Sequence, residues 1–359
     1  MTHSLETPPD LKLSGLDWPR LDTYLSSRGH SLDKSVRPRR FSAGYGNMNF
    51  LLKIDGEEVV LRRPPLGPVP PGANDMAREF RILSHVHDAL PLVPQAKLFC
   101  DDPEIIGARF LVMEYRPGLV IGDEIPSDIL EKWTNPTSIG KHLGGKIINV
   151  LAELHAVDVH ACGLGDLGRP EGFIARTLRG WSKRSHLSWV ASTPAKLDEL
   201  VEWLNAHPPT KSNAASLIHN DFKLDNIILD PITLSPRTLI DWDMGTLGDP
   251  QYDLAVLLSY WSEATDPEAM HQLRQMPTSG HGFPTREEAA ELYAKASRKE
   301  LHDFTFYRVL ATLRLAVVFQ QLYRRYETGG TDDTKFANFD NLALGLLDFG
   351  MDIARGRHF

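Results

Sequence analysis

The first third of the chain alternates apolar and polar residues, a pattern typical of short β-strands. Residues 50–54 and 58–63 are two such runs, joined by Asp55-Gly56, a dipeptide that favours the tight turn of a β-hairpin. Further strand-like runs cover residues 39–43, 96–99 and 109–115. The pattern therefore predicts a small antiparallel sheet.

Helical spacing of apolar residues occurs once in this region and dominates afterwards. Apolar residues recur at three-residue intervals from Ala77 to Val86, which predicts a helix that Asn74 or Asp75 would cap. Further helices are predicted over residues 138–156, 195–205, 286–297, 303–325 and 339–354. Two short strand-like runs, residues 227–229 and 238–240, lie among them.

A break at Pro117-Gly118 divides the chain into two expected lobes. The N-terminal lobe covers residues 1–116 and begins with a leader, residues 1–30, which contains a short helix over residues 18–27. The C-terminal lobe covers residues 117–359 and is mostly helical. A length of 359 residues agrees with two domains of ordinary size. The expected fold class is α+β.

Composition and charge narrow the class of protein. Hydrophobic residues make up 42% and charged residues 24%, values typical of a globular chain. The 39 basic residues are outnumbered by 47 acidic ones, so no overall positive field attracts nucleic acid or an anionic membrane. Cys100 and Cys162 are too few for a disulfide framework and fit a reducing compartment. We therefore expect a cytoplasmic protein without nucleic-acid or membrane partners, in an oligomeric state that stays open.

The segment from His219 to Asn226 carries the clearest chemical signal. A carboxylate and a carboxamide separated by four residues on a tight loop can face one site. Asp221 would accept the proton of a hydroxyl group, and Asn226 would bind a divalent metal. Twenty residues after Asp221, an apolar strand leads to Asp241, a second oxygen ligand that suits Mg²⁺. A single acidic residue is more often a cap or turn carboxylate, but this joint pattern is harder to obtain by chance.

Two features of the first lobe could bind phosphate. Residues 41–49 form a loop with small residues whose backbone N–H groups can approach phosphate oxygens. The next strand places Arg62 on one face, where Glu79 of the following helix can hold it. An ordinary hairpin turn and an ordinary surface ion pair stay open as alternatives.

These motifs together resemble the aminoglycoside phosphotransferase family, whose members are kinases related in fold to protein kinases and choline kinases. The resemblance rests on His-x-Asp-(x)4-Asn at residues 219–226, Ile-Asp at 240–241 and Gly-Asp-Pro-x-x-Asp-Leu-Ala at 248–255. It extends from about residue 41 to residue 325. Residues 168–182 and 221–226 further resemble the subgroup that occurs fused to acyl-CoA dehydrogenase domains. The resemblance implies a two-lobed protein-kinase-like fold.

The resemblance also implies roles for individual residues. Asp221 matches the catalytic base, Lys223 a lysine that contacts the γ-phosphate, and Asn226 and Asp241 the ligands of Mg²⁺. The residues that match the nucleotide site, for ATP with GTP left open, are Gly44, Gly46, Asn47, Arg62, Glu79, Met113 and Tyr115. Of these, Met113 and Tyr115 match the hinge beside adenine. Asp253 would hold backbone amides of the catalytic loop, and His155 matches a structural position.

The acceptor of the phosphoryl group is predicted to be a small molecule with a hydroxyl group. Basic residues surround Trp181 between residues 176 and 186, which favours an anionic acceptor such as a hydroxy acid or hydroxyacyl compound. A solvated helix face is the alternative. Arg314 has apolar neighbours at helical spacing, so its guanidinium is expected to be buried and to need a partner, such as an aspartate of the catalytic region.

Three alternatives to this function stay open. Arg62 and Asn220 depart from the family pattern, as would suit a nucleotide-binding regulatory pseudokinase. A true aminoglycoside kinase is the second alternative, and a Mg²⁺-dependent hydrolase that uses the acidic residues is the third.

Overall fold

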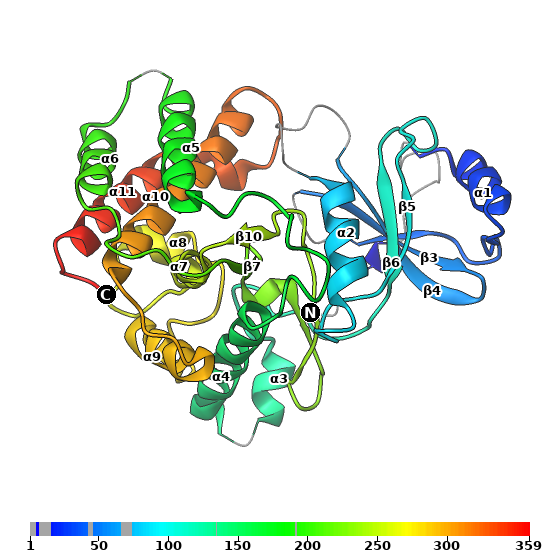
Figure 1. Cartoon of the computed structure of the whole chain (residues 1–359), viewed down its shortest axis with the longest axis horizontal. Helices are drawn as coiled ribbons and strands as arrows, with labels where there is room; N and C mark the ends of the chain where they lie inside the picture. The colour runs from blue at the N-terminus through cyan, green and yellow to red at the C-terminus, as the bar shows by residue number, and fades with distance from the viewer. Residues whose placement is uncertain (1–4, 7–15, 42–45, 66–73, 134, 191) are drawn as a thin grey trace. The chain divides into compact units, whose positions relative to one another are not determined.

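The computed structural model describes residues 5–6, 16–41, 46–65, 74–133, 135–190 and 192–359 (Figure 1). Contacts divide the chain into two compact units, each built from three separate stretches. The first unit comprises Met1–Val120, Val157–Gly165 and Asp225–Gly245, and the second comprises Ile121–Ala156, Asp166–Leu224 and Thr246–Phe359. The lobe boundary expected at residues 116–117 stays a prediction.

A six-stranded antiparallel sheet forms the centre of the first unit. Its strand order is β1-β2-β3-β4-β6-β5. The strands are β1 (Leu5–Glu6), β2 (Arg39–Phe41), β3 (Met48–Ile54), β4 (Glu57–Arg63), β5 (Ala96–Cys100) and β6 (Phe110–Glu114). β3 and β4 form the predicted hairpin, in which Asp55 and Gly56 have φ values of 52° and 83°. Positive φ at both turn positions explains the Asp-Gly pair.

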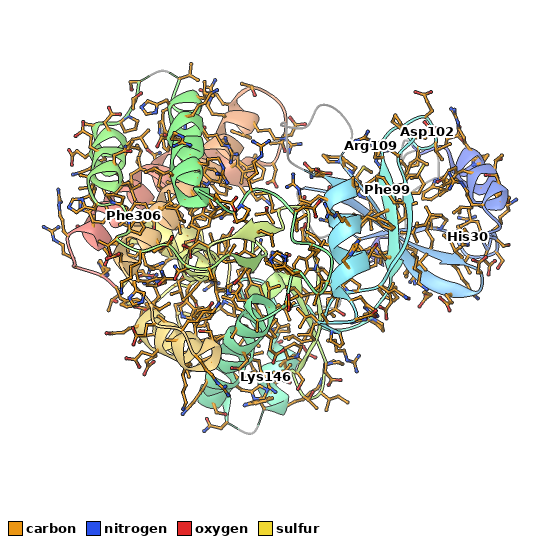
Figure 2. All side chains as sticks on the ribbon, in the orientation of Figure 1. His30, Phe99, Asp102, Arg109, Lys146 and Phe306 are labelled. Carbon is orange, nitrogen blue, oxygen red and sulfur yellow. The ribbon has the colours of Figure 1, made fainter. Side chains whose placement is uncertain are left out.

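Two helices pack on this sheet. α1 (Trp18–Ser27) buries Leu21 in a core that includes side chains of β3, β4 and β6. α2 (Met76–Val86) packs against β5, where the rings of Phe80 and Phe99 stack with centroids 5.5 Å apart. Figure 2 labels Phe99 among the side chains of the sheet. Both helices were predicted, α2 from the spacing of its apolar residues.

A second pair of strands completes the first unit with residues from far along the chain. β8 (Ile227–Leu229) and β9 (Pro236–Leu239) pair in antiparallel fashion. A β-bridge between Leu119 and Leu229 joins β8 to the first stretch of the unit, Met1–Val120. A Cβ atom at Gly118 would lie only 2.5 Å from the carbonyl oxygen of Leu229, so glycine is required at this crossing. Both strands lie at the positions predicted for them.

The second unit is mostly helical. Its helices are α3 (Ser127–Lys132), α4 (Pro136–His155), α5 (Phe173–Ser188), α6 (Ala195–Ala206), α7 (Pro250–Tyr260), α8 (Glu268–Gln272), α9 (Arg286–Ser297), α10 (Phe304–Glu327) and α11 (Phe339–Ala354). The short strands β7 (Ser216–Ile218) and β10 (Thr246–Gly248) pair in antiparallel fashion. α7 is buried along its whole length and packs on α10, which also contacts α5, α6 and α11.

The structure confirms the α+β fold class and most of the predicted elements. It adds elements that were not predicted, among them α3, α5, α8, β1, β7 and β10. Among the described residues, no helix combines the length and the apolar character needed to cross a membrane.

Candidate active site

Arg62 and Glu79 form a buried ion pair in the first unit. β4 carries Arg62 and α2 carries Glu79, and Nε of the arginine donates to Oε2 of the glutamate at 2.8 Å. Only 4% of Arg62 and none of Glu79 is exposed. The guanidinium also contacts the Asp241 carboxylate and donates to Oδ1 of Asn49 at 3.3 Å. The pair is therefore an internal one, and the alternative of an ordinary surface ion pair is wrong.

Three carboxylates, those of Glu79, Asp241 and Asp243, lie around the guanidinium of Arg62. Burial opposes the charged form of Arg62, but Asp241 and Glu79 outweigh it and raise the arginine's pKa. Burial raises the pKa of Glu79 against the effect of Arg62. Burial and the charge of Asp241 raise the pKa of Asp243 to about 8. An excess of carboxylates in a buried place suits the binding of a further cation.

The predicted metal ligands Asn226 and Asp241 lie close to the ends of paired strands. Asn226 directly precedes β8, and Asp241 follows β9 by two residues. The carbonyl oxygen of Asn226 accepts the N–H of Ile240 at 2.9 Å, which holds the two segments together. Asp241 has a φ of 69°, in the left-handed region that non-glycine residues adopt uncommonly. One carboxamide and one carboxylate, both oxygen donors, fit Mg²⁺.

The predicted phosphate-binding loop lies partly outside the described residues. Gly44 is outside, whereas Gly46 and Asn47 are described. Nδ2 of Asn47 donates to Oδ2 of Asp243 at 3.0 Å, and its Oδ1 accepts from Asn74 at 2.8 Å. Asp243 was not predicted as a site residue, although its place two residues after Asp241 was a signal for it.

Met113 and Tyr115 lie on either side of the last residue of β6. Met113 is buried and pairs with Val60 of β4. Tyr115 is partly buried, and its ring centroid lies 6.1 Å from that of Phe41. Contact between this segment and adenine stays a prediction.

Asp221, the candidate base, follows β7 in the second unit and contacts residues of α7 and α10. Its Oδ1 accepts hydrogen bonds from the hydroxyl of Tyr260 and, at 3.1 Å, from Nη2 of Arg314. Nζ of Lys223 lies 3.9 Å from Oδ2. Burial opposes ionisation, but Lys223 and Arg314 outweigh it and hold the pKa of Asp221 well below its usual range. The burial of Arg314 and its need for a partner are confirmed, and the partner is this aspartate.

Asp253 of α7 anchors the loop that carries Asp221. Its carboxylate accepts the backbone N–H groups of His219 and Asn220, both at 2.7 Å. Nε2 of His155 lies 3.1 Å from the same carboxylate. Asn220 has a φ of 66°, so the loop makes a left-handed step directly before Asp221. These contacts confirm that Asp253 holds the loop amides, and the structural role of His155 stays a prediction.

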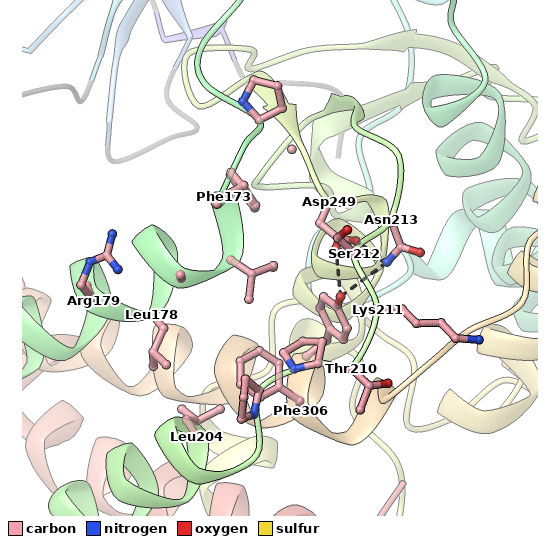
Figure 3. Close-up of a pocket in the computed structure, with 18 of the residues that line it drawn as sticks. Phe173, Leu178, Arg179, Leu204, Thr210, Lys211, Ser212, Asn213, Asp249 and Phe306 are labelled. Atoms are coloured by element: carbon pink, nitrogen blue, oxygen red, sulfur yellow. Dashed lines mark hydrogen bonds between the residues drawn. The ribbon is translucent and has the colours of Figure 1, made fainter.

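A cavity of about 480 Å³ lies in the second unit beside α5 and the first turns of α7 and α10 (Figure 3). Phe173, Leu204 and Phe306 line its apolar part. Nδ2 of Asn213 donates to Oδ1 of Asp249 at 3.0 Å, so these polar groups bond to each other. Its described lining includes none of the predicted site residues.

Comparison with known proteins gives this geometry a family. The sequence profile of the Phosphotransferase enzyme family matches residues 37–292. The chain belongs to this family. The chain is 29% identical, over 357 residues, to acyl-CoA dehydrogenase family member 10 of Mus musculus. The match covers 98% of this chain and 32% of that protein. It is 30% identical, over 339 residues, to acyl-CoA dehydrogenase family member 11 of Rattus norvegicus, with coverages of 93% and 42%.

The phosphotransferase-family chain thus spans about a third to two fifths of the length of these relatives. Among solved structures, a Ralstonia eutropha protein provisionally named an aminoglycoside phosphotransferase has a TM-score of 0.76 and 24% identity, covering 95% of this chain and 99% of that one. A choline/ethanolamine kinase family protein from Mesorhizobium loti has a TM-score of 0.55 and 16% identity, with coverages of 89% and 88%. These similarities confirm the kinase-like fold and the predicted subgroup.

Proposed function

We propose that the chain is a kinase that transfers the γ-phosphoryl group of ATP, with Mg²⁺, to a hydroxyl group of a small anionic molecule. The observation that carries this proposal is the environment of Asp221. Its carboxylate is kept ionised beside Lys223 and Arg314, on a loop whose amides Asp253 holds. Such an ionised carboxylate is suited to orient a hydroxyl group, and it can take up the proton as the hydroxyl oxygen bonds to phosphorus. GTP is the alternative phosphate donor.

In the proposed reaction, the acceptor oxygen forms a bond to the γ-phosphorus while the bond to the β-phosphate oxygen breaks. Asp221 receives the proton of the acceptor hydroxyl. Lys223 stabilises negative charge on the transferring group. Asn226 and Asp241 would hold Mg²⁺, which when bound neutralises charge on the β- and γ-phosphates.

The first unit would bind the rest of the nucleotide. Arg62, held by Glu79, supplies positive charge for the α- and β-phosphates, as a lysine does in related kinases. Its planar fork differs from a compact ammonium, so the contact with phosphate would differ in geometry. Backbone N–H groups around Gly46 and Asn47 would cover the phosphates.

An anionic acceptor is proposed because α5 is rich in basic side chains, one of which, Arg184, lies on the same tryptophan ring as Arg314. The basic side chains of α5 are Arg176, Arg179, Lys183, Arg184 and His186. The guanidinium of Arg184 lies 4.4 Å from the ring centroid of Trp181, and that of Arg314 lies 5.8 Å from it. A polycationic aminoglycoside would be repelled by these groups, which weighs against a true aminoglycoside kinase.

One contact favours a regulatory pseudokinase as the second candidate. Arg62 stands where related kinases carry lysine, and its guanidinium contacts the carboxylate of Asp241, a predicted ligand of Mg²⁺. In this arrangement the carboxylate of Asp241 is engaged in an ion pair with Arg62.

The test is a screen of purified protein with Mg²⁺–ATP against aminoglycosides, choline, sugars, and hydroxy acids with their CoA esters. Transfer of phosphate to the acceptor is followed, not loss of ATP. We expect an anionic acceptor to be phosphorylated and Asp221→Asn to lower the rate by at least about 100-fold, with little change in Mg²⁺–ATP affinity. Asp230→Asn, which alters a turn carboxylate of the first unit, is the matched control and should keep full activity.

Two outcomes would contradict the proposal. Tight binding of Mg²⁺–ATP without transfer to any acceptor would favour the pseudokinase. Loss of both turnover and nucleotide binding in Asp221→Asn would make that residue structural.

A further inference from the structure

Arg314 of α10 is buried and makes contacts with residues outside its own helix. Only 5% of the residue is exposed. Its Nη1 donates to the hydroxyl of Tyr260 at 2.7 Å, and its Nη2 donates to the carbonyl oxygen of Asn220 at 3.0 Å and to Oδ1 of Asp221 at 3.1 Å. The hydroxyl of Tyr260 in turn donates to the same Oδ1. Arginine, tyrosine and aspartate therefore form a closed triangle of hydrogen bonds.

Two aromatic rings hold the guanidinium of Arg314 in place. Its Cζ atom lies 5.7 Å from the ring centroid of Tyr260 and 5.8 Å from that of Trp181 on α5. Nε1 of Trp181 donates to the hydroxyl of Tyr252 at 3.2 Å, which fixes the indole. Cation–π contacts in a desolvated place restrict the arginine further. The cation, which α10 carries, is thus fixed by residues of α5 and α7 and by the loop of Asn220 and Asp221.

We propose that Arg314 and Tyr260 are positioning residues for phosphoryl transfer, which hold Asp221 by its Oδ1 atom and direct Oδ2 toward the acceptor hydroxyl. This inference rests on the proposed function. In it, Arg314 touches neither nucleotide nor acceptor and acts only through Asp221. Fixing one oxygen of a carboxylate with two donors restricts its rotation, so that the reacting oxygen keeps one direction.

The same contacts control the charge of Asp221. The groups that face it are Lys223 on its own loop, His219 at the end of β7, Tyr260 on α7 and Arg314 on α10. A carboxyl group whose folded-state pKa is depressed stays ionised until the pH falls through that lowered value. Removing Arg314 takes away one of the two cations that oppose the effect of burial. The pKa of Asp221 should then rise, and activity at acid pH should be lost earlier.

A purely structural role would give a different result. If Arg314 only tied α10 to the catalytic loop, its loss would lower stability without moving the pH dependence of turnover. Arg308 allows the comparison. It lies six residues earlier on α10 and is 1% exposed, and its guanidinium donates to the backbone oxygen of Phe359 at 3.2 Å. Arg308→Met therefore removes a buried arginine from the same helix without touching Asp221.

The experiment measures kcat, KM and their pH dependence for full-length Arg314→Met, Arg314→Lys, Tyr260→Phe and Arg308→Met. We expect Arg314→Met to lower kcat by about 10- to 100-fold, with KM for ATP nearly unchanged. The acid limb of kcat/KM should move up by about 1–3 pH units. Arg314→Lys should restore part of both, Tyr260→Phe should show a smaller loss, and Arg308→Met should move neither.

A second measurement needs no acceptor and keeps the inference testable by itself. The ¹³C resonance of the Asp221 carboxyl group, assigned by its loss in Asp221→Asn, is followed from pH 8 to pH 3. Wild type should stay ionised, and Arg314→Met should titrate. If it titrates while no acceptor is phosphorylated, the proposed function fails, whereas the part of the inference in which Arg314 controls the charge of Asp221 is supported. If the carboxyl group of Arg314→Met stays ionised as in wild type, the positioning role is overturned, whatever the activity.

Discussion

Replacing Glu79 by glutamine removes one carboxylate from the buried cluster around Arg62 and keeps the shape of the side chain. Glu79 is fully buried, and its two oxygens accept from Nε of Arg62 at 2.8 Å and from the backbone N–H of Trp242 at 3.3 Å. Glutamine can still accept one of these bonds. Its amide group, however, cannot balance the charge of the arginine.

The loss of stability depends on the contacts that Arg62 keeps in the variant. Removing one partner of a buried ion pair costs about 3–5 kcal/mol, because the other charge stays buried and uncompensated. Here Arg62 keeps its contact with Asp241, so the cost should lie below that range, at about 2–3 kcal/mol. This corresponds to a roughly 30- to 150-fold change in the equilibrium between folded and open forms.

The assay is amide hydrogen exchange of α2 and of residues 240–245, which reports the free energy of opening for this part of the first unit. Glu57→Gln is the matched control. Glu57 lies on β4, and its carboxylate accepts from Nζ of Lys97 at 2.6 Å, but its side chain is 66% exposed. An exposed pair of this kind contributes at most about 1 kcal/mol.

A comparable change in exchange for the two variants would refute this reasoning. It would mean that burial adds nothing to the contribution of the Arg62–Glu79 pair, and that the packing of α2 on the sheet stabilises this region without it.

Two further predictions concern α4 and the metal site. Gly140→Ala should destabilise the protein by about 1–3 kcal/mol, because the added Cβ would lie 2.3 Å from the backbone N of Phe283. Gly145→Ala on the same helix meets open space and should stabilise the protein by about 0.5–1 kcal/mol. Thermal unfolding compares the two variants, and equal effects would contradict the steric argument. Asp241→Ala should weaken Mg²⁺–ATP binding by at least about tenfold in calorimetry, and unchanged affinity would contradict the metal assignment.

The features that could be predicted from the sequence have local signals. The β3–β4 hairpin was visible because Asp55-Gly56 separates two strand patterns, and the turn needs positive φ at both positions. The catalytic loop was visible because Asp221 and Asn226 lie within a few residues of each other. Arg314 is a charged residue among apolar neighbours at helical spacing, which predicted its burial and an aspartate of the catalytic region as its partner.

The features that could not be predicted depend on contacts between distant parts of the chain. Tyr260 contacts Asp221 across 39 residues of chain, and no local pattern marks that pairing. β7 and β10 have three residues each, too few for a period of two to be recognised. α5 was missed because its many basic residues obscure the buried stripe of Leu178, Trp181 and Ser185.

The order of synthesis matters for a unit built from separate stretches of chain. The strand pair β8 and β9 belongs to the first unit, yet it is made more than a hundred residues after Val120. At roughly 5–20 residues per second, the ribosome needs on the order of ten seconds to reach Gly245. During that interval the six-stranded sheet lacks part of its own unit, and the bridge between Leu119 and Leu229 cannot form. Folding of the first unit is therefore completed only after residues 121–156 and 166–224 of the second unit have been made.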